Sequence, residues 1–165
     1  MSRPSGRARS KGAASPSVHP LLTRRASGVL LHLSSVPGAH GIGDLGPGAR
    51  ATVAWLAAAG QRFWQMLPVN PIGAGDSPYS SLSAFAGEPL FVSLEDLVDE
   101  GWLPRSATRA PGALGRGATR YDAARAFKMP RLLAAYAAFC DANGERRADY
   151  RAFLRANVAW LDAWC

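Results

Sequence analysis

The sequence has 165 residues, 48% of them hydrophobic, with five Trp, four Tyr and six Phe, and its formal net charge is +7. This length fits a single domain, and the apolar content excludes a chain that is disordered throughout. No apolar run approaches the roughly 18 residues that a membrane span needs, and two cysteines, Cys140 and Cys165, are too few for a disulfide framework.

The positive charge is concentrated at the N-terminus. Residues 1–25 carry six basic side chains and no acid, whereas the other 140 residues carry 13 bases and 12 acids. We expect residues 1–25 to be a disordered basic extension, with a transit peptide as the alternative. Because this segment has no aromatic side chain to stack on bases, nucleic acid is not an expected partner.

A strand–helix–strand unit is predicted where the composition changes. Residues 28–33 form a short apolar run that suits a strand buried on both faces. Residues 47–60 predict a helix, because Pro47 stands near its first turn and Gly60 just past its end. Residues 63–67 predict a second strand, which this connection makes parallel to the first. The helix face expected to be buried comprises Ala49, Val53, Leu56 and Gly60.

Residues 41–46 match the G-x-G-x-x-G pattern of dinucleotide-binding loops. In a dinucleotide-binding fold the first glycine directly follows the strand, whereas residues 37–40 (PGAH) intervene here. In addition, no acid that could bind a ribose lies between Asp44 and Asp76. We therefore interpret the glycines as a tight loop leading into the helix, with Asp44 able to cap the helix N-terminus.

The predicted second strand leads into residues 69–89, a connection rich in Gly, Pro and Ser that lacks helical or strand periodicity. A connection of this length is uncommon unless it is functional or disordered, and its aromatic residues argue against disorder. The carboxyl end of a parallel strand is where α/β folds place their sites.

The remaining sequence predicts mostly helix. A short helix capped by Ser93 is expected to end at Gly101, and residues 104–120 to form a polar link. A longer helix is expected from near Asp122 to Gly144, interrupted or restarted at Pro130, and a last helix follows from Tyr150. The apolar stripe expected on the longer helix comprises Leu132, Leu133, Tyr136, Ala137 and Cys140.

Four segments in this order carry a family resemblance: residues 27–38 (SGVLLHLSSVPG), 41–46 (GIGDLG), 63–68 (FWQMLP) and 75–87 (GDSPYSSLSAFAG). Together they resemble the N-terminal part of the 4-α-glucanotransferases, the amylomaltase or disproportionating-enzyme family. The resemblance extends over about residues 26–165 and is weaker after residue 103.

The resemblance implies an α/β fold: the N-terminal part of a (β/α)8 TIM barrel, made of the first βαβ unit and a largely helical insertion. It implies transfer of a 1,4-α-glucan segment to the 4-hydroxyl of another glucan or of glucose, by a retaining double displacement that uses no metal or organic cofactor. The three acids that the family uses lie on later strands, so no catalytic residue is assigned here. A barrel needs roughly 200–250 residues, so residues 26–165 are expected to be an incomplete barrel without activity alone.

Ser77 and Tyr79 are the substrate-binding residues that the resemblance implies, on the donor side of a glucan cleft. An ordinary turn with a half-buried tyrosine is the alternative. Asp76 is expected to support the loop through an Asx-type turn rather than to act as an acid or base. His32 is interpreted as a core or loop residue, and Gln65 as a possible anchor of the loop.

Other residues are expected to be structural. His19 and His40 have no neighbours in the sequence with metal-ligand spacing, and Cys140 is expected to be inert on an apolar stripe. Glu88 stands where the family commonly has Asn, which adds a charge beside the loop.

The expected partners are α-1,4-glucans, maltooligosaccharides and glucose, with no nucleic acid and no membrane, in the cytoplasm. A non-catalytic carbohydrate-binding or interaction fragment is the alternative function.

Overall fold

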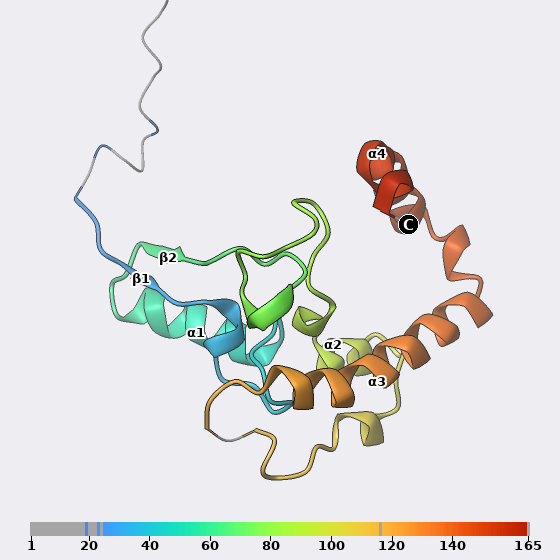
Figure 1. Ribbon diagram of the computed structural model, residues 1–165, viewed down its shortest axis with the longest axis horizontal. Coiled ribbons are helices and arrows are strands. Elements are labelled where there is room, and N and C mark those ends of the chain that lie inside the picture. Colours follow the sequence, from blue (N-terminus) through green and yellow to red (C-terminus); the bar gives the residue numbers. More distant parts are fainter. Residues whose placement is uncertain (1–18, 20–22, 24, 116, 165) are drawn as a thin grey trace, which may run out of the picture.

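The computed structural model describes residues 19, 23, 25–115 and 117–164 (Figure 1). The disordered extension predicted for residues 1–25 lies almost entirely outside the described residues. Among the described residues, no helix combines the length and the apolar character needed to cross a membrane.

The predicted strand–helix–strand unit is confirmed. Strand β1 (Gly28–Leu30), helix α1 (Pro47–Ala58) and strand β2 (Phe63–Gln65) follow one another (Figure 1). The two strands pair in parallel, with Val29 opposite Trp64. Their ladder continues past β1, where the Leu31 N–H donates to the Gln65 carbonyl at 3.0 Å.

The predicted ends of α1 are confirmed, but its buried face is only partly as expected. Pro47 is the first helical residue, and Gly60 follows the helix with φ +73°, a left-handed conformation that favours glycine. Ala49 and Leu56 are buried, whereas Val53 is exposed.

The prediction that the first strand is buried on both faces is wrong for this chain. Leu30 is 59% exposed, and Phe63 on β2 is also exposed. The described residues form a two-stranded sheet, so each strand has a single neighbour. A parallel strand loses its solvent exposure only when further strands and helices cover its edges and faces.

Three further helices follow, together with short 3-10 turns. Helix α2 (Leu94–Asp99) begins where Ser93 Oγ accepts a hydrogen bond from the Asp96 N–H at 3.1 Å, which confirms the predicted cap. Gly101 follows α2 with φ +85°. The other helices are α3 (Tyr121–Asp141) and α4 (Ala148–Trp164), and the 3-10 turns are η2 (Leu33–Ser35), η3 (Ala74–Asp76), η4 (Pro89–Phe91), η5 (Arg105–Thr108) and η6 (Gly144–Arg146).

The predicted interruption at Pro130 is wrong, because α3 is continuous through it. Proline removes one backbone donor from the helix, and the neighbouring Arg131 adds side-chain bonds to the same turn. Its guanidinium donates to the Phe127 carbonyl at 2.7 Å and lies 3.6 Å from the centre of the Phe127 ring. A second donation, to the Ala107 carbonyl at 2.7 Å, ties this turn to the preceding link.

The apolar stripe predicted on this helix is only partly correct, because Leu132 packs against a buried cluster but most of the other members do not. Leu133, Tyr136 and Cys140 are exposed, and the buried residues of α3 are Ala124, Lys128 and Ala135. The buried face is therefore set by the elements that α3 crosses. These are η4, which belongs to the first of two buried clusters, and α2, which belongs to the second. The first cluster comprises Leu33, Val36, Ile42, Ala49, Leu90, Phe91 and Ala124, and the second Leu94, Leu103 and Ala135.

Candidate functional site

The irregular connection predicted for residues 69–89 leaves the carboxyl end of β2 and closes on itself at its base. The Glu88 N–H donates to the Val69 carbonyl at 2.9 Å, and the Asn70 side-chain amide donates to the Ala86 carbonyl at 3.0 Å. These bonds join the two ends of the loop and hold its base closed, and the intervening residues project from this base.

The buried Glu88 carboxylate stabilises the base of the loop through hydrogen bonds to backbone groups. Glu88 is only 4% exposed, and its two oxygens accept from the Ile72 N–H at 2.7 Å and the Leu90 N–H at 3.1 Å. Both oxygens therefore serve backbone groups, which gives the charge a structural role. The sequence indicated that Glu88 departs from the family at this position. It did not indicate that the buried carboxylate would link the backbone of Ile72 to that of Leu90.

The tip of the loop contains the two predicted substrate-binding residues. Ser77 Oγ accepts a hydrogen bond from the Tyr79 N–H at 3.3 Å, and the Tyr79 side chain is 72% exposed. Asp76 has φ +56° and follows Gly75 at φ +73°. Among the hydrogen bonds of the described loop, the turn is therefore made by the Ser77 hydroxyl and not by the Asx-type bond predicted for Asp76.

Serine hydroxyls shape the rest of the loop. Ser81 Oγ donates to the Ser83 carbonyl at 2.8 Å, and Ser83 Oγ accepts from the N–H groups of Phe85 at 3.2 Å and Ala86 at 3.0 Å. Phe85 stacks on Trp160 of α4, with ring centroids 6.0 Å apart and planes at 16°. The loop thus exposes Tyr79 while Phe85 contacts the last helix.

His32 has the structural role that was expected. It is buried, its Nε2 donates to the Pro68 carbonyl at 3.2 Å, and its Nδ1 lies 2.7 Å from Ser34 Oγ. The predicted side-chain anchor at Gln65 is replaced by Trp64, whose Nε1 donates to the Leu31 carbonyl at 2.7 Å. These contacts fix the junction between the two strands and the loop.

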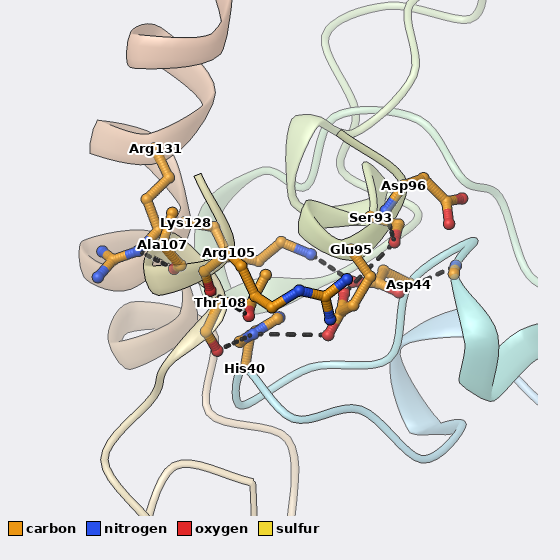
Figure 2. Close-up of polar contacts among 11 residues, drawn as sticks. His40, Asp44, Ser93, Glu95, Asp96, Arg105, Ala107, Thr108, Lys128 and Arg131 are labelled. Carbon is orange, nitrogen blue, oxygen red and sulfur yellow. Dashed lines mark hydrogen bonds and ion pairs between the residues drawn. The ribbon is translucent and has the colours of Figure 1, made fainter. Parts of the chain in front are cut away.

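The fold places two acids near His40, a grouping that the sequence analysis did not predict. The nearest ligand atoms of His40, Asp44 and Glu95 all lie within 4.8 Å of one another (Figure 2). His40 and Asp44 are four positions apart, but Glu95 lies more than 50 positions further along the chain, so the sequence does not indicate the complete cluster. His40 Nε2 lies 3.1 Å from the Thr108 carbonyl and 3.7 Å from Glu95 Oε1.

A lysine supplies the positive charge of this cluster. Lys128 Nζ donates to Asp44 Oδ2 at 2.6 Å, and the lysine is fully buried (Figure 2). A divalent ion would meet this ammonium group at close range and be repelled. The chemistry of the donor set therefore favours a structural ion pair over a metal centre.

The glycine-rich segment also has a packing role. Asp44 Oδ1 accepts from the Gly46 N–H at 3.0 Å, one residue before the helix, and α1 has no side-chain cap at its N-terminal capping residue. The prediction that Asp44 caps the helix is therefore wrong: its side chain bonds to a backbone N–H of the loop just before the helix. A Cβ added to Gly43 would lie 2.3 Å from the Leu33 carbonyl oxygen, so the glycine permits close packing of backbone on backbone. This supports the tight-loop interpretation over a dinucleotide site.

These features define an α/β chain in which the longest loop follows the carboxyl end of a parallel strand, the usual place for a binding site in such folds. A sequence profile of the 4-alpha-glucanotransferase family matches residues 31–165, and the chain therefore belongs to that family.

Relatives from bacteria and plants bear the same description. The chain is 40% identical over 139 residues to the 4-alpha-glucanotransferase of Thermus thermophilus, covering 84% of this chain and 27% of the relative. It is 40% identical over 145 residues to a rice enzyme described as chloroplastic/amyloplastic, covering 84% and 24%. The solved amylomaltase from Streptococcus agalactiae in complex with acarbose matches with a TM-score of 0.72 and 32% identity, covering 83% of this chain and 28% of that one.

The family resemblance inferred from the motifs is confirmed by these matches. The coarser fold expectation, an α/β chain similar to part of an amylomaltase, is confirmed as well. The chain spans less than a third of the length of each of these relatives. The roles of Ser77 and Tyr79 stay predictions.

Proposed function

We propose that this chain provides part of the glucan cleft of a 4-alpha-glucanotransferase, with Ser77 and Tyr79 contacting the donor glucan. The observation that carries the proposal is the braced loop at the end of β2, which presents an exposed tyrosine ring in a chain of this family. The amylomaltase complex with acarbose supports an oligosaccharide as the ligand class.

The chemistry of the two side chains suits a sugar. The Tyr79 ring offers an apolar face for the C–H side of a pyranose and a hydroxyl for hydrogen bonding. The Ser77 hydroxyl both donates and accepts. Pro78, between them, restricts the backbone, so that less conformational entropy is lost on binding.

The proposed reaction is a retaining double displacement. One carboxylate attacks the anomeric carbon while a carboxylic acid protonates the leaving oxygen. The acceptor 4-hydroxyl then displaces the carboxylate as the second group takes its proton. The two groups must lie about 5–5.5 Å apart across the scissile bond, and Glu88 is unsuited because backbone N–H groups occupy both its oxygens. We assign the reacting acids to residues outside this chain.

In this proposal β1, α1 and β2 are the first βαβ unit of a (β/α)8 barrel, and the helices after residue 93 are its insertion. The substrates are α-1,4-glucans, maltooligosaccharides and glucose, and the location is cytoplasmic. The proposal includes no metal or organic cofactor, no nucleic acid and no membrane partner.

A chimera tests the substrate contact in a complete enzyme. Residues 26–165 replace the aligned segment of the Thermus thermophilus relative, and glucose release from maltotriose is measured. We expect Tyr79→Ala to lower kcat/KM at least tenfold and Tyr79→Phe to lower it less, because the phenylalanine ring still stacks. Leu133→Ala, an exposed position on α3, is the matched control.

Equal kcat/KM for the parent chimera and Tyr79→Ala would contradict the substrate contact. The assignment of the acids is tested separately with the purified 165-residue chain. We expect it to leave maltotriose unchanged, and conversion of maltotriose to glucose and longer maltodextrins would overturn that assignment.

A further inference from the structure

A series of three hydrogen bonds joins the start of α3 to the start of the loop of residues 69–89. The Tyr121 hydroxyl donates to Ser34 Oγ at 2.9 Å, and Ser34 Oγ lies 2.7 Å from His32 Nδ1. His32 Nε2 lies 3.2 Å from the carbonyl oxygen of Pro68, the residue before the loop. We call these four residues the His32 network. Its members lie 36 and 87 positions apart in the sequence at the two long-range bonds.

The chemistry of the groups determines the direction of each bond in the His32 network. The Pro68 carbonyl can only accept, so His32 Nε2 carries a hydrogen. In a neutral imidazole Nδ1 then has no hydrogen, and it accepts from the Ser34 hydroxyl. Because Ser34 uses its hydrogen in this bond, its oxygen is free to accept from the Tyr121 hydroxyl. The network is therefore complete when His32 is neutral.

The imidazole has a fixed position, because the groups around it are held in place. Ser34 is 5% exposed and His32 is 8% exposed. Thr119 Oγ1, just before α3, donates to the Ser34 carbonyl at 2.9 Å, so the serine is bonded through its backbone as well as its side chain. On the other side, the His32 ring meets Phe91 edge to face with centroids 5.6 Å apart.

The surroundings of His32 provide no counter-ion for a protonated ring. Among the ion pairs of the described residues none includes His32. Tyr121 of α3 faces it only through Ser34, and Lys128 of the same helix is paired with Asp44. Both oxygens of Glu88, next to η4, accept from backbone N–H groups. A buried imidazolium without a carboxylate partner is costly.

Protonation would also break the hydrogen-bond pattern. An imidazolium donates from both nitrogens, so Nδ1 would donate to Ser34 Oγ instead of accepting from it. One hydroxyl hydrogen, that of Ser34 or that of Tyr121, then has no acceptor within the network. The unpaired hydroxyl and the uncompensated charge both disfavour the protonated ring in this position, so the ring would move out of it.

We propose that His32 is a positioning residue for the loop of residues 69–89, and that it acts in its neutral form. The imidazole holds the Pro68 carbonyl and thereby fixes the point at which the loop leaves β2. The next carbonyl, that of Val69, closes the base of the loop by accepting from Glu88. Displacement of Pro68 therefore displaces the residues that carry Tyr79. The effect on glucan binding rests on the proposed function, whereas the network itself does not.

Long-range ¹H–¹⁵N NMR spectra of the purified 165-residue chain test the network without reference to activity. We expect the signals of His32 at pH 7 to be those of a neutral ring with its hydrogen on Nε2, and their absence from His32→Gln assigns them. A ring that is mainly protonated on Nδ1, or mainly charged, would overturn the proposal.

The chimera with the Thermus thermophilus relative tests the positioning role. His32→Gln keeps a side-chain N–H that can reach the Pro68 carbonyl but takes up no proton, whereas His32→Leu has no donor. At pH 7 we expect His32→Leu to lower kcat/KM for maltotriose at least tenfold, and His32→Gln to lower it less than threefold. Between pH 8 and pH 5, where histidine usually titrates, the chimera should lose at least threefold more activity than His32→Gln does.

A second buried histidine provides the matched control. His40 Nε2 also lies close to a backbone carbonyl, that of Thr108, but it is outside the His32 network. His40→Gln should leave the pH profile of the chimera unchanged. Equal pH profiles for the chimera and His32→Gln would overturn the proposal, and this comparison remains decisive if His32→Leu does not fold.

A double variant shows whether His32 acts through the loop. Where Tyr79→Ala lowers kcat/KM, adding His32→Leu should lower it little further, because the contact that His32 positions is already lost. Losses that multiply in the double variant would overturn the proposal. If Tyr79→Ala changes nothing, the proposed glucan contact of Tyr79 fails, and the pH comparison alone decides the role of His32.

Discussion

Lys128 is the largest fully buried side chain of the described residues, and it is charged. Its partner Asp44 lies 84 positions away, in the loop before α1, so their ion pair joins α3 to the strand–helix–strand unit. Burying two charges is costly, and removing one of them leaves the other without compensation. The Asp44–Lys128 pair therefore determines how these two parts pack.

We expect Lys128→Met to lower the free energy of unfolding by about 3–5 kcal/mol, because the buried Asp44 carboxylate loses its counter-ion. Urea titration at pH 7, followed by tryptophan fluorescence, measures the change. The double variant Asp44→Asn/Lys128→Met should recover most of the loss, because an amide oxygen at position 44 still accepts from the Gly46 N–H. A Lys128→Met variant as stable as the parent would show that water reaches the carboxylate.

The sequence predicted the site only where local chemistry determines the structure. The irregular loop of residues 69–89 follows from its composition and its place after a strand, whereas the exposure of Tyr79 is a finding of the structure. Glu88 and the His40 cluster depend on residues brought together by the fold, and neither the single acid nor the isolated histidine carries a spacing signal. A buried charge such as Lys128 also runs against the apolar pattern from which a helix face is predicted.

Among the secondary-structure elements, too, the features predicted correctly are those that nearby residues determine. The ends of α1 and α2 were predicted because Pro47, Gly60 and Ser93 act within one turn of their positions. The continuity of α3 was missed, since Arg131 supports the turn at Pro130 through bonds that include one to Ala107, 24 residues away. The exposure of β1 was missed because an apolar run does not say how many strands cover it.

The start of α4 should respond to acid. Hydrogen bonds from Arg147 and from the Tyr150 N–H lower the pKa of Asp149 from 3.8 to about 2. The folded state thus holds the ionised carboxylate more strongly than the unfolded chain does. The stabilisation is complete above about pH 4 and is lost as the pH falls toward 2.

We therefore expect the first turn of α4 to open between about pH 4 and pH 2. Hydrogen exchange of the Tyr150 amide, which donates to Asp149 Oδ1 at 2.9 Å, reports this opening. Asp149→Asn should make the exchange independent of pH in this window after correction for intrinsic rates. Asp162→Asn, at the other end of α4, should leave the transition in place. A pH-dependent transition that persists in Asp149→Asn would assign it to another acid.

At the scale of the whole molecule, the apolar surface is unevenly covered. The buried clusters gather around α3, η4 and α2, whereas Leu30 on β1, Val53 and Trp55 on α1 and Phe63 on β2 are exposed. Paired strands with open edges and exposed apolar side chains readily associate with other strands. In the proposed barrel, neighbouring strands would cover this surface.

The isolated chain should therefore self-associate through the β1–β2 sheet. Leu30→Lys places a charge on that surface, and we expect it to weaken association at least tenfold, or about 1.4 kcal/mol. Sedimentation velocity over a range of chain concentrations measures the effect, with Leu133→Lys on α3 as the control at a similarly exposed leucine. Equal weakening by both variants would indicate a general effect of charge. A chain that stays monomeric at every concentration would mean that the exposed strands need no cover, which would remove the physical reason for placing further barrel strands beside them.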